Sequence, residues 1–118
     1  MNDDVTTLTD LKKTLAQFVA EREWNRFHTP KNIAASICIE AAELLEDFQW
    51  LEADQCERDK LPPEKLHAIG EECADVLAYL LSLANRLGLD LAEVYDRKMK
   101  RNAEKYPIEQ FRGRSGSE

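Results

Sequence analysis

Long apolar runs are absent from the sequence. No stretch reaches the roughly 18 consecutive apolar residues that indicate a membrane-spanning helix. No basic-then-apolar segment of the kind that forms a signal peptide opens the chain. We therefore expect no transmembrane helix, no signal peptide and no membrane partner.

Cysteine is scarce, and its three copies follow no motif. Cys38, Cys56 and Cys73 are an odd number and lack CxxC spacing, which argues against a disulfide framework. We interpret them as reduced, buried thiols of a cytoplasmic protein.

Positive charge is in deficit, because 23 acidic residues outweigh 16 lysines and arginines and leave a net charge of −7. A nucleic-acid-binding surface needs a basic patch, so we expect no nucleic-acid partner. The deficit does not exclude a nucleotide site, because a bound metal ion can supply the positive charge.

Strand-like alternation, internal repeats and low-complexity segments are also absent, and helical periodicity takes their place. Apolar spacing predicts four helices, over about Leu8–Glu23, Pro30–Trp50, Pro62–Leu87 and Asp90–Lys105. The stretch Glu52–Leu61 is charged and has no periodicity, which predicts a loop. Four helices with short links predict an all-α four-helix bundle. We expect a single domain over residues 1–118, with a core over about 8–107 and a loose tail over 108–118.

Residues that cap or stop helices mark these boundaries. Threonine or aspartate begins a helix well, proline suits its first position, and glycine commonly follows its end. The chain carries such signals at Thr7 with Asp10, Thr29 with Pro30, Gly88, Asp90 with Glu93, and Pro107.

Two helical stretches, Ile33–Phe48 and Ala68–Leu83, are apolar on nearly every side, which predicts core helices. In so short a chain, two such helices carry more apolar surface than one subunit can cover. We therefore expect a homo-oligomer, either a dimer or a tetramer, that completes the fold.

Each of these helices nevertheless carries two acids three positions apart, Glu40 with Glu43 and Glu72 with Asp75. Residues at that spacing share one helix face, and unpaired carboxylates are costly to bury. If the helices pack antiparallel, the four carboxylates meet at one point. Oxygen ligands without histidine favour Mg²⁺, with Mn²⁺ possible, and Mg²⁺ is usually completed by substrate phosphates. The acids therefore predict a site for a metal–phosphate substrate.

Neighbouring acids are less distinctive. Asp47 lies on the same stripe as Glu40 and Glu43, so we interpret it as a residue that supports the metal ligands. Glu46 and Glu71 lie further round their helices, and we interpret both as solvated.

Two other interpretations use the same acids. A di-iron carboxylate bundle needs a Glu-x-x-His pair on each of two helices, but the chain has one such spacing, Glu64 with His67. In a non-catalytic helical binding or assembly module, the acids would form ion pairs across subunits. The stripes hold no lysine or arginine beside the acids, since Arg86 lies well beyond Glu72. The metal-site interpretation is therefore favoured.

The segments around the acids resemble the MazG-like all-α nucleoside triphosphate pyrophosphohydrolases, and within them the branch that contains the dCTP pyrophosphatases. The segments that carry the resemblance are Ala20–Asn32, Glu43–Trp50, Glu71–Ala84 and Asp96–Pro107. The resemblance covers about residues 8–107. It departs from the wider superfamily at Ile39, where a further glutamate is common, as the dCTP-pyrophosphatase branch also does. The first-helix position that would face the site is aliphatic here, at Leu15.

The resemblance implies a Mg²⁺-dependent enzyme of nucleotide-pool sanitation. It would hydrolyse a (deoxy)nucleoside triphosphate, with dCTP or a modified dCTP favoured, to the monophosphate and pyrophosphate. It implies metal-binding roles for Glu40, Glu43, Glu72 and Asp75. We assign catalytic roles to Glu43 and Glu72, with Glu43 orienting or deprotonating the attacking water, although helical periodicity does not separate Glu43 from Glu40.

The resemblance also implies substrate contacts, at Trp24, Phe27, His28, Trp50 and Tyr79 for the base and at Lys98, Asn102, Lys105 and Tyr106 for the phosphates. Spacing alone places Lys98, Asn102 and Lys105 on one helix face, which suits a triphosphate clamp or a solvated basic face equally.

The residues themselves support the base contacts unequally. Tyr79 lies one turn beyond the acid pair of its helix, so it should line the same cavity. Trp24 and Trp50 lie outside helix ends, where an aromatic ring can stack on a base or close a core. His28 and Asn32 can bond a base or their own loop.

Overall fold

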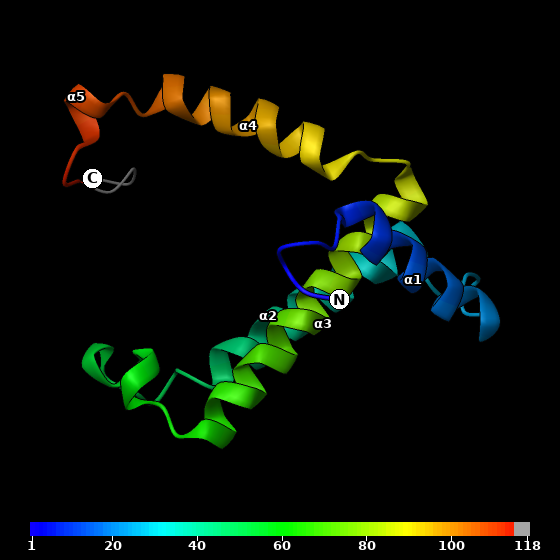
Figure 1. The fold of residues 1–118 in the computed structure, drawn as a ribbon, viewed down its shortest axis with the longest axis horizontal. Helices are drawn as coiled ribbons and strands as arrows, with labels where there is room; N and C mark the ends of the chain where they lie inside the picture. Colours follow the sequence, from blue (N-terminus) through cyan, green and yellow to red (C-terminus); the bar gives the residue numbers. More distant parts are fainter. Residues whose placement is uncertain (115–118) are drawn as a thin grey trace. The chain divides into compact units, whose positions relative to one another are not determined.

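A computed structural model describes residues 1–114, and within that range the chain consists of helices and the segments that join them. In chain order the helices are α1 (Leu8–Glu21), α2 (Pro30–Glu46), the 3₁₀ helices η1 (Ala53–Gln55) and η2 (Arg58–Lys60), α3 (Pro63–Leu87), α4 (Leu91–Lys105) and α5 (Ile108–Phe111) (Figure 1). The predicted all-α class is confirmed. The chain divides into two compact units, Met1–Gly88 and Leu89–Glu118, which are described separately.

Side-chain caps begin the helices where the sequence predicts them. The Thr7 hydroxyl accepts from the Asp10 N–H at 3.1 Å, and the Asp10 carboxylate accepts from the Thr7 N–H at 3.0 Å. The side chains of Thr29 and Asp90 accept backbone N–H groups at the starts of α2 and α4. Proline occupies the first position of α3, at Pro63, where its missing N–H costs nothing.

Two helices end earlier than predicted. α1 stops at Glu21 rather than near Glu23, because Glu23 takes the left-handed conformation with φ of 53°. α2 stops at Glu46 rather than near Trp50, because the backbone then tightens into turns. The N–H groups of Asp47 and Phe48 bond carbonyls three residues back, those of Leu44 at 3.2 Å and Leu45 at 2.9 Å. α3 ends as predicted, since Gly88 is left-handed with φ of 66°.

The loop and tail carry more structure than the sequence indicates. The predicted loop over Glu52–Leu61 contains η1 and η2. The predicted loose tail begins with α5, so the prediction is wrong for Ile108–Phe111. Its last four positions, 115–118, lie outside the described residues.

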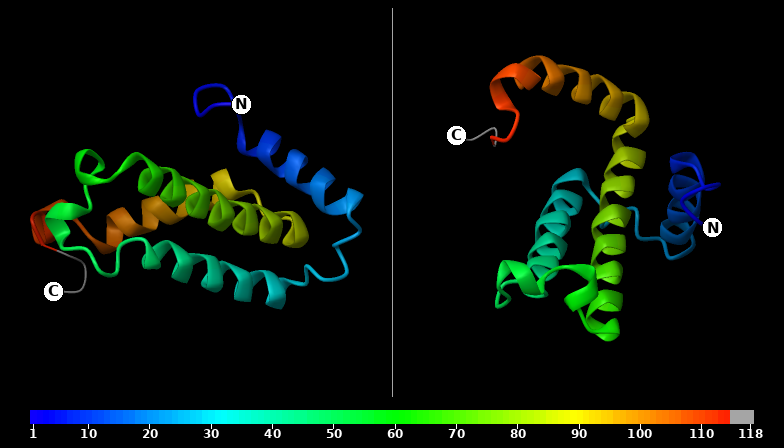
Figure 2. Two further views of the ribbon diagram at one scale, coloured as in Figure 1. Left: turned by 90° about the horizontal axis from the view of Figure 1, so that it is seen from below. Right: turned by 60° about the vertical axis from the view of Figure 1, so that its left-hand side comes forward.

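In the first unit, α2 and α3 lie side by side and antiparallel, and α1 packs against α3 (Figure 2). The buried apolar residues of the described chain are Val19, Ile33, Leu81 and Ala84, one or two from each of α1, α2 and α3. They gather where the start of α2, the second half of α3 and the end of α1 meet. The hydrophobic core is therefore small and lies at one end of the α2–α3 hairpin.

Much of the apolar surface of α2 and α3 stays exposed in the single chain. Ile39 is 58% exposed and Leu45 is 60% exposed on α2, and Leu77 and Leu80 of α3 are exposed as well. In the single chain each helix buries only one face, so the expectation that both are core helices is wrong for their outer faces. The outer faces agree with the predicted homo-oligomer, which stays a prediction.

The cysteines are free, as expected, but not buried. Cys38 and Cys73 are exposed, and Cys56 is half-buried, so the expectation of buried thiols is wrong for this chain taken alone. The reason is that Cys38 and Cys73 lie on the outward faces of α2 and α3. Among residues 1–114, no helix is both long and apolar enough to cross a bilayer.

The second unit contains α4 and α5. Along α4, Lys100 pairs with Asp96 at 3.0 Å and Arg97 with Glu93 at 3.7 Å, one turn apart in each case. The ring of Tyr106 meets Phe111 of α5 edge to face at 5.1 Å between centroids, which holds the short helix against the end of α4.

Candidate functional site

Three carboxylates meet between α2 and α3. The antiparallel packing sets Glu40 and Glu43 opposite Glu72, and one oxygen atom from each of the three lies within 4.8 Å of the others. A cation bound at about 2.0–2.6 Å from each oxygen would fit among atoms at this spacing. Glu40 and Glu72 are half-buried, whereas Glu43 is exposed. The arrangement can hold one divalent cation with one carboxylate still open to solvent.

The electrostatics of this cluster favour a cation. One oxygen of Glu40 and one of Glu72, each Oε2, are buried without a hydrogen-bond partner. Partial burial raises the pKa of Glu40 to about 7, and the adjacent Glu43 carboxyl group adds to the rise. Burial, followed by the charge of Glu43, likewise raises the pKa of Glu72. Since acids with raised pKa values are destabilised when ionised, a bound cation would relieve the repulsion. The donor set, all carboxylate oxygen, fits Mg²⁺ or Mn²⁺.

Asp75, the fourth predicted ligand, lies at the edge of the cluster. It does not belong to the set of atoms within 4.8 Å, yet its charge contributes to the raised pKa of both Glu40 and Glu72. Asp75 is exposed and lines the adjoining pocket. Its role as a metal ligand stays a prediction.

The neighbouring acids have other positions. Asp47 caps the end of α2 and pairs with Lys65 of α3 at 3.9 Å. Glu46 and Glu71 are exposed, as the sequence predicts, and Glu71 accepts from His67 at 2.9 Å.

A pocket of about 310 Å³, here called the ring pocket, begins at Asp75 and runs between α3, α1 and residues 22–29, the α1–α2 segment. Its lining residues are Leu15, Phe18, Val19, Trp24, His28, Asp75, Ala78, Tyr79 and Ser82. Four of their rings form a series, with centroids 5.7 Å apart for Phe18–Trp24, 6.1 Å for Trp24–His28 and 6.3 Å for His28–Tyr79. Such a wall can stack a flat heteroaromatic ligand next to the acids.

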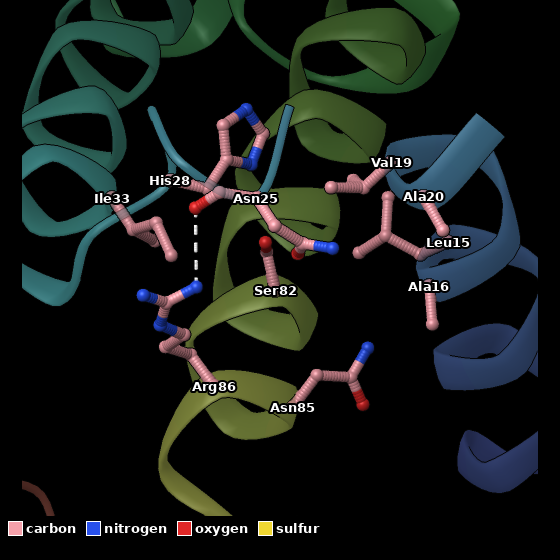
Figure 3. Close-up of a pocket in the computed structure, with 10 residues that line it drawn as sticks. All are labelled: Leu15, Ala16, Val19, Ala20, Asn25, His28, Ile33, Ser82, Asn85 and Arg86. Carbon is pink, nitrogen blue, oxygen red and sulfur yellow. Dashed lines mark hydrogen bonds between the residues drawn. The ribbon is translucent and has the colours of Figure 1, made fainter. Parts of the chain in front are cut away.

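A second pocket, of about 350 Å³, adjoins the first and is here called the amide pocket (Figure 3). It shares four lining residues with the ring pocket: Leu15, Val19, His28 and Ser82. Asn25, Asn85 and Arg86 add polar groups to its wall. Arg86 Nη1 donates to the Asn25 carbonyl at 3.1 Å, and Asn85 Nδ2 donates to the Lys12 carbonyl at 3.0 Å. These bonds join the end of α3 to the α1–α2 segment and to α1.

Three of the predicted base contacts come together in the ring pocket: Trp24, His28 and Tyr79. Leu15, expected to face the site from α1, lines it too. His28 Nδ1 is buried there without a hydrogen-bond partner among the described residues, so it is available to a ligand.

Three other predicted contacts lie outside that pocket. Phe27 is 55% exposed and stacks under the Arg26 guanidinium at 4.6 Å. Asn32 Nδ2 donates to the Phe27 carbonyl at 3.0 Å, so it bonds the backbone of its own segment. Trp50, 87% exposed, follows the end of α2. Their contacts with substrate stay predictions.

The predicted phosphate contacts all belong to the second unit. Within that unit, Lys98 is exposed, the Asn102 amide lies 3.8 Å from the Met99 sulfur, and the Lys105 ammonium lies 5.4 Å from the centre of the Tyr106 ring. Their approach to a substrate stays a prediction.

Sequence reasoning missed four pocket residues: Phe18, Val19, Ala78 and Ser82. Helical spacing offered a signal for all four. Phe18 and Val19 lie three and four positions beyond Leu15, and Ala78 and Ser82 lie three beyond Asp75 and Tyr79. Each therefore continues a face that the sequence had already singled out.

Comparison with known proteins gives consistent results. The model of the MazG-like family matches residues 35–117, a range that includes all four predicted metal ligands. The chain is 39% identical over 107 residues to dCTP pyrophosphatase 1 of Mus musculus and 38% identical over 109 residues to dCTP pyrophosphatase 1 of Homo sapiens. These matches cover 91% and 92% of this chain but 63% and 64% of the relatives, so the chain spans less than two thirds of their length.

A solved structure is similar as well. The crystal structure of a pyrophosphatase from Archaeoglobus fulgidus DSM 4304 superposes with a TM-score of 0.79 at 40% identity. The similarity covers 91% of this chain and 98% of that one. The two chains therefore share one all-α fold over nearly their whole lengths.

Proposed function

Because the chain belongs to the MazG-like family, we propose that it hydrolyses nucleoside triphosphates to the monophosphate and pyrophosphate, with dCTP or a modified dCTP favoured. The observation that carries the proposal is the meeting of Glu40, Glu43 and Glu72 within 4.8 Å beside a pocket walled by aromatic rings. The similarity to dCTP pyrophosphatases and to the archaeal pyrophosphatase supports the same reaction.

Glu40, Glu43 and Glu72 would hold the divalent cation, with Asp75 as a fourth ligand. We propose Mg²⁺, with Mn²⁺ as a substitute, because all the donors are carboxylate oxygens. When bound, the cation would neutralise phosphate charge and lower the pKa of a coordinated water. Its binding would also compensate the buried, unpartnered oxygens of Glu40 and Glu72.

Glu43 is the proposed base. It is exposed while Glu40 and Glu72 are half-buried, so its carboxylate has the freest access to a water that approaches from solvent. Water would add to the α-phosphorus as its proton passes to this carboxylate. The bond from that phosphorus to the bridging oxygen would break, and pyrophosphate would leave. This difference in exposure supports Glu43 over Glu40, which helical spacing alone did not separate.

The ring pocket would take the base. Trp24, His28 and Tyr79 offer stacking faces next to Asp75, and His28 Nδ1 offers a free hydrogen-bonding atom. Phe27, Asn32 and Trp50 complete the proposed base contacts. For the phosphates we propose the basic and polar face of α4, with Lys98, Asn102, Lys105 and Tyr106.

The proposed setting is a cytoplasmic homo-oligomer, a dimer or a tetramer, that takes no part in nucleic-acid binding. The free cysteines, the exposed apolar faces of α2 and α3 and the net charge of −7 support these three expectations in turn.

A product analysis tests the reaction. The purified chain is incubated with Mg²⁺ and each of the four common dNTPs, and the products are separated by ion exchange. We expect equal amounts of monophosphate and pyrophosphate, with dCTP turned over most efficiently. Release of diphosphate and phosphate would place the cleavage at another bond and contradict the proposal. No turnover of any triphosphate, together with no Mn²⁺ binding by titration, would contradict the metal site itself.

A further inference from the structure

The α1–α2 segment carries two of the rings that line the ring pocket, Trp24 and His28, yet it is not part of a helix. Its turns are held by short-range backbone bonds, such as Phe27 N–H to the Trp24 carbonyl at 2.9 Å and His28 N–H to the Asn25 carbonyl at 3.3 Å. Its second residue is Glu23, whose φ of 53° is costly for a residue with a side chain. Bonds within the segment fix its shape, but they do not fix its position against α3.

Arg86 supplies a hydrogen bond that fixes the position of the α1–α2 segment against α3. It lies in the last turn of α3, and its Nη1 donates to the Asn25 carbonyl at 3.1 Å across 61 positions of sequence (Figure 3). That carbonyl also accepts the His28 N–H. The His28 N–H is shared with the Trp24 carbonyl, at 3.1 Å, so Arg86 is bonded to one of the two carbonyl oxygens that hold the backbone of His28. A shift of this bond would move His28 relative to Tyr79 of α3, since the centroids of the two rings lie 6.3 Å apart.

We propose that Arg86 is a positioning residue for base selectivity: it holds the α1–α2 segment against α3, so that Trp24 and His28 stand at stacking distance from Tyr79. This inference rests on the proposed function, and Arg86 itself lines the amide pocket rather than the ring pocket. Arginine suits the role because its planar fork presents donors in a fixed geometry, whereas lysine offers a single mobile ammonium group. Small displacements of positioning groups have large effects on binding and rate.

A simpler role for Arg86 would be to stabilise α3, because a cation in the last turn interacts favourably with the helix dipole. Two variants separate the roles. Arg86→Ala removes both the charge and the bond. Arg86→Lys keeps the charge at the helix end but loses the fork. A role confined to stability predicts that Arg86→Lys behaves as the wild type in every assay.

Steady-state kinetics with dCTP and dTTP provide the first measurement. For Arg86→Ala and Arg86→Lys we expect KM for dCTP to rise roughly tenfold while kcat changes less than about threefold. The preference for dCTP over dTTP, as a ratio of kcat/KM, should fall by a similar factor. Mn²⁺ affinity should be unchanged, because the carboxylates lie elsewhere on α3 and on α2. Wild-type KM and selectivity in both variants would overturn the inference.

Two control variants accompany the kinetics. Arg58→Ala removes an arginine from η2 and should leave KM and selectivity unchanged. Leu81→Val destabilises the buried core at a residue that lines neither pocket, and it should lower the melting temperature without altering selectivity. If Leu81→Val shifts selectivity as much as Arg86→Ala, lost stability accounts for the effect and the inference is overturned.

A second measurement needs no substrate, so it remains decisive if the proposed function fails. In a Trp50→Phe background, Trp24 is the one remaining tryptophan. Arg86→Ala in this background should increase acrylamide quenching of Trp24 fluorescence, because the segment would lose its bond to α3. Unchanged quenching would overturn the positional role even in an inactive protein. A wild-type chain that hydrolyses no triphosphate would instead contradict the proposed function.

Discussion

Glu40 and Glu72 each keep one carboxylate oxygen buried without a hydrogen-bond partner, and the pKa of each is raised. Groups of this kind destabilise a folded chain when they ionise without compensation. At the scale of single residues, the proposed metal site therefore opposes the stability of the metal-free protein. Two expectations follow, one for a substitution and one for pH.

Replacing Glu72 by glutamine removes a ligand and a negative charge while it keeps the size of the side chain. We expect turnover to fall by roughly a thousandfold, since a catalytic cation supplies several kcal/mol of stabilisation. The melting temperature of the metal-free protein should rise, because repulsion within the cluster is reduced. Glu71→Gln, at the exposed neighbouring position, is the matched control and should retain full activity. Unchanged activity in Glu72→Gln would refute the metal assignment.

The stability of the metal-free protein should fall as pH rises through the window between about 4.5 and 7. In this window the folded chain holds a proton on Glu40, whose pKa is about 7, and the unfolded chain releases it near the ordinary value of 4.5. The stabilisation from this group is complete below the lower value and lost above the higher one. Glu72, also raised, acts in the same direction.

Melting curves in EDTA from pH 5 to pH 8 measure this effect, with Glu40→Gln as the reference that cannot titrate at position 40. The melting temperature of the wild type relative to that of Glu40→Gln should fall as pH rises, and it should be lowest at the highest pH. A difference that stays constant across the range would show that Glu40 does not carry the shift.

At the scale of the helices, two glycines of the same chain invite opposite expectations. Gly88 ends α3 with φ of 66°, and Gly70 lies within α3 in helical conformation with nothing within 4 Å of an added methyl group. Gly88→Ala should destabilise the protein by about 1 kcal/mol, because alanine is strained in the left-handed region. Gly70→Ala should stabilise it by roughly 0.5–1 kcal/mol, because glycine lowers helix stability.

Urea unfolding followed by circular dichroism measures both changes. The two variants add the same methyl group, one in the left-handed and one in the helical conformation. If both change the free energy of unfolding in the same direction by the same amount, backbone conformation does not explain their effects.

Helix starts were predictable from sequence, and helix ends less so. The caps at Thr7, Thr29 and Asp90 act within four residues, so a local pattern contains all the information. The ends of α1 and α2 depend on the left-handed Glu23 and on turns after Glu46, which no local pattern marks.

The candidate site divides in the same way. The acids of α2 and α3 were predictable because helical spacing puts them on one face. The α1 side of the pocket was predictable only in part. Helical spacing puts Phe18 and Val19 on the same face as Leu15, but their place in the pocket depends on the packing of α1 on α3. The hydrogen bond from the Asn32 side-chain amide to the Phe27 carbonyl likewise depends on the shape of the α1–α2 segment, which the sequence left open.

At the scale of the whole molecule, the exposed apolar faces of α2 and α3 call for a covering surface. Among the described residues the core contains four buried apolar residues, whereas side chains as large as Ile39, Leu45 and Trp50 remain more than half exposed. Proteins seldom leave neighbouring apolar groups exposed on this scale unless they bind a partner. A second copy of the chain is the partner that the sequence predicts.

Leu45→Glu tests that expectation, because a buried, unpaired charge opposes association. We expect the dissociation constant of the oligomer to increase at least about tenfold, measured by light scattering after gel filtration across a dilution series. Thr9→Glu introduces the same charge at an exposed polar position of α1 and should leave the mass unchanged. Wild-type protein that elutes at the mass of one chain at all concentrations would contradict the expectation.

The placement of the core at one end of the α2–α3 hairpin also bears on how the molecule opens. Ile33, Leu81 and Ala84 secure the end near α1, whereas the middle of the hairpin holds carboxylates that repel one another and the far end leads into η1 and η2. Backbone amides should therefore exchange with solvent slowly near Leu81 and progressively faster toward Pro63, so that fraying begins at the η2 end. A cation bound midway would join α2 to α3 beyond the core. It should therefore slow the exchange of backbone amides in the half of the hairpin that hydrophobic packing leaves unprotected.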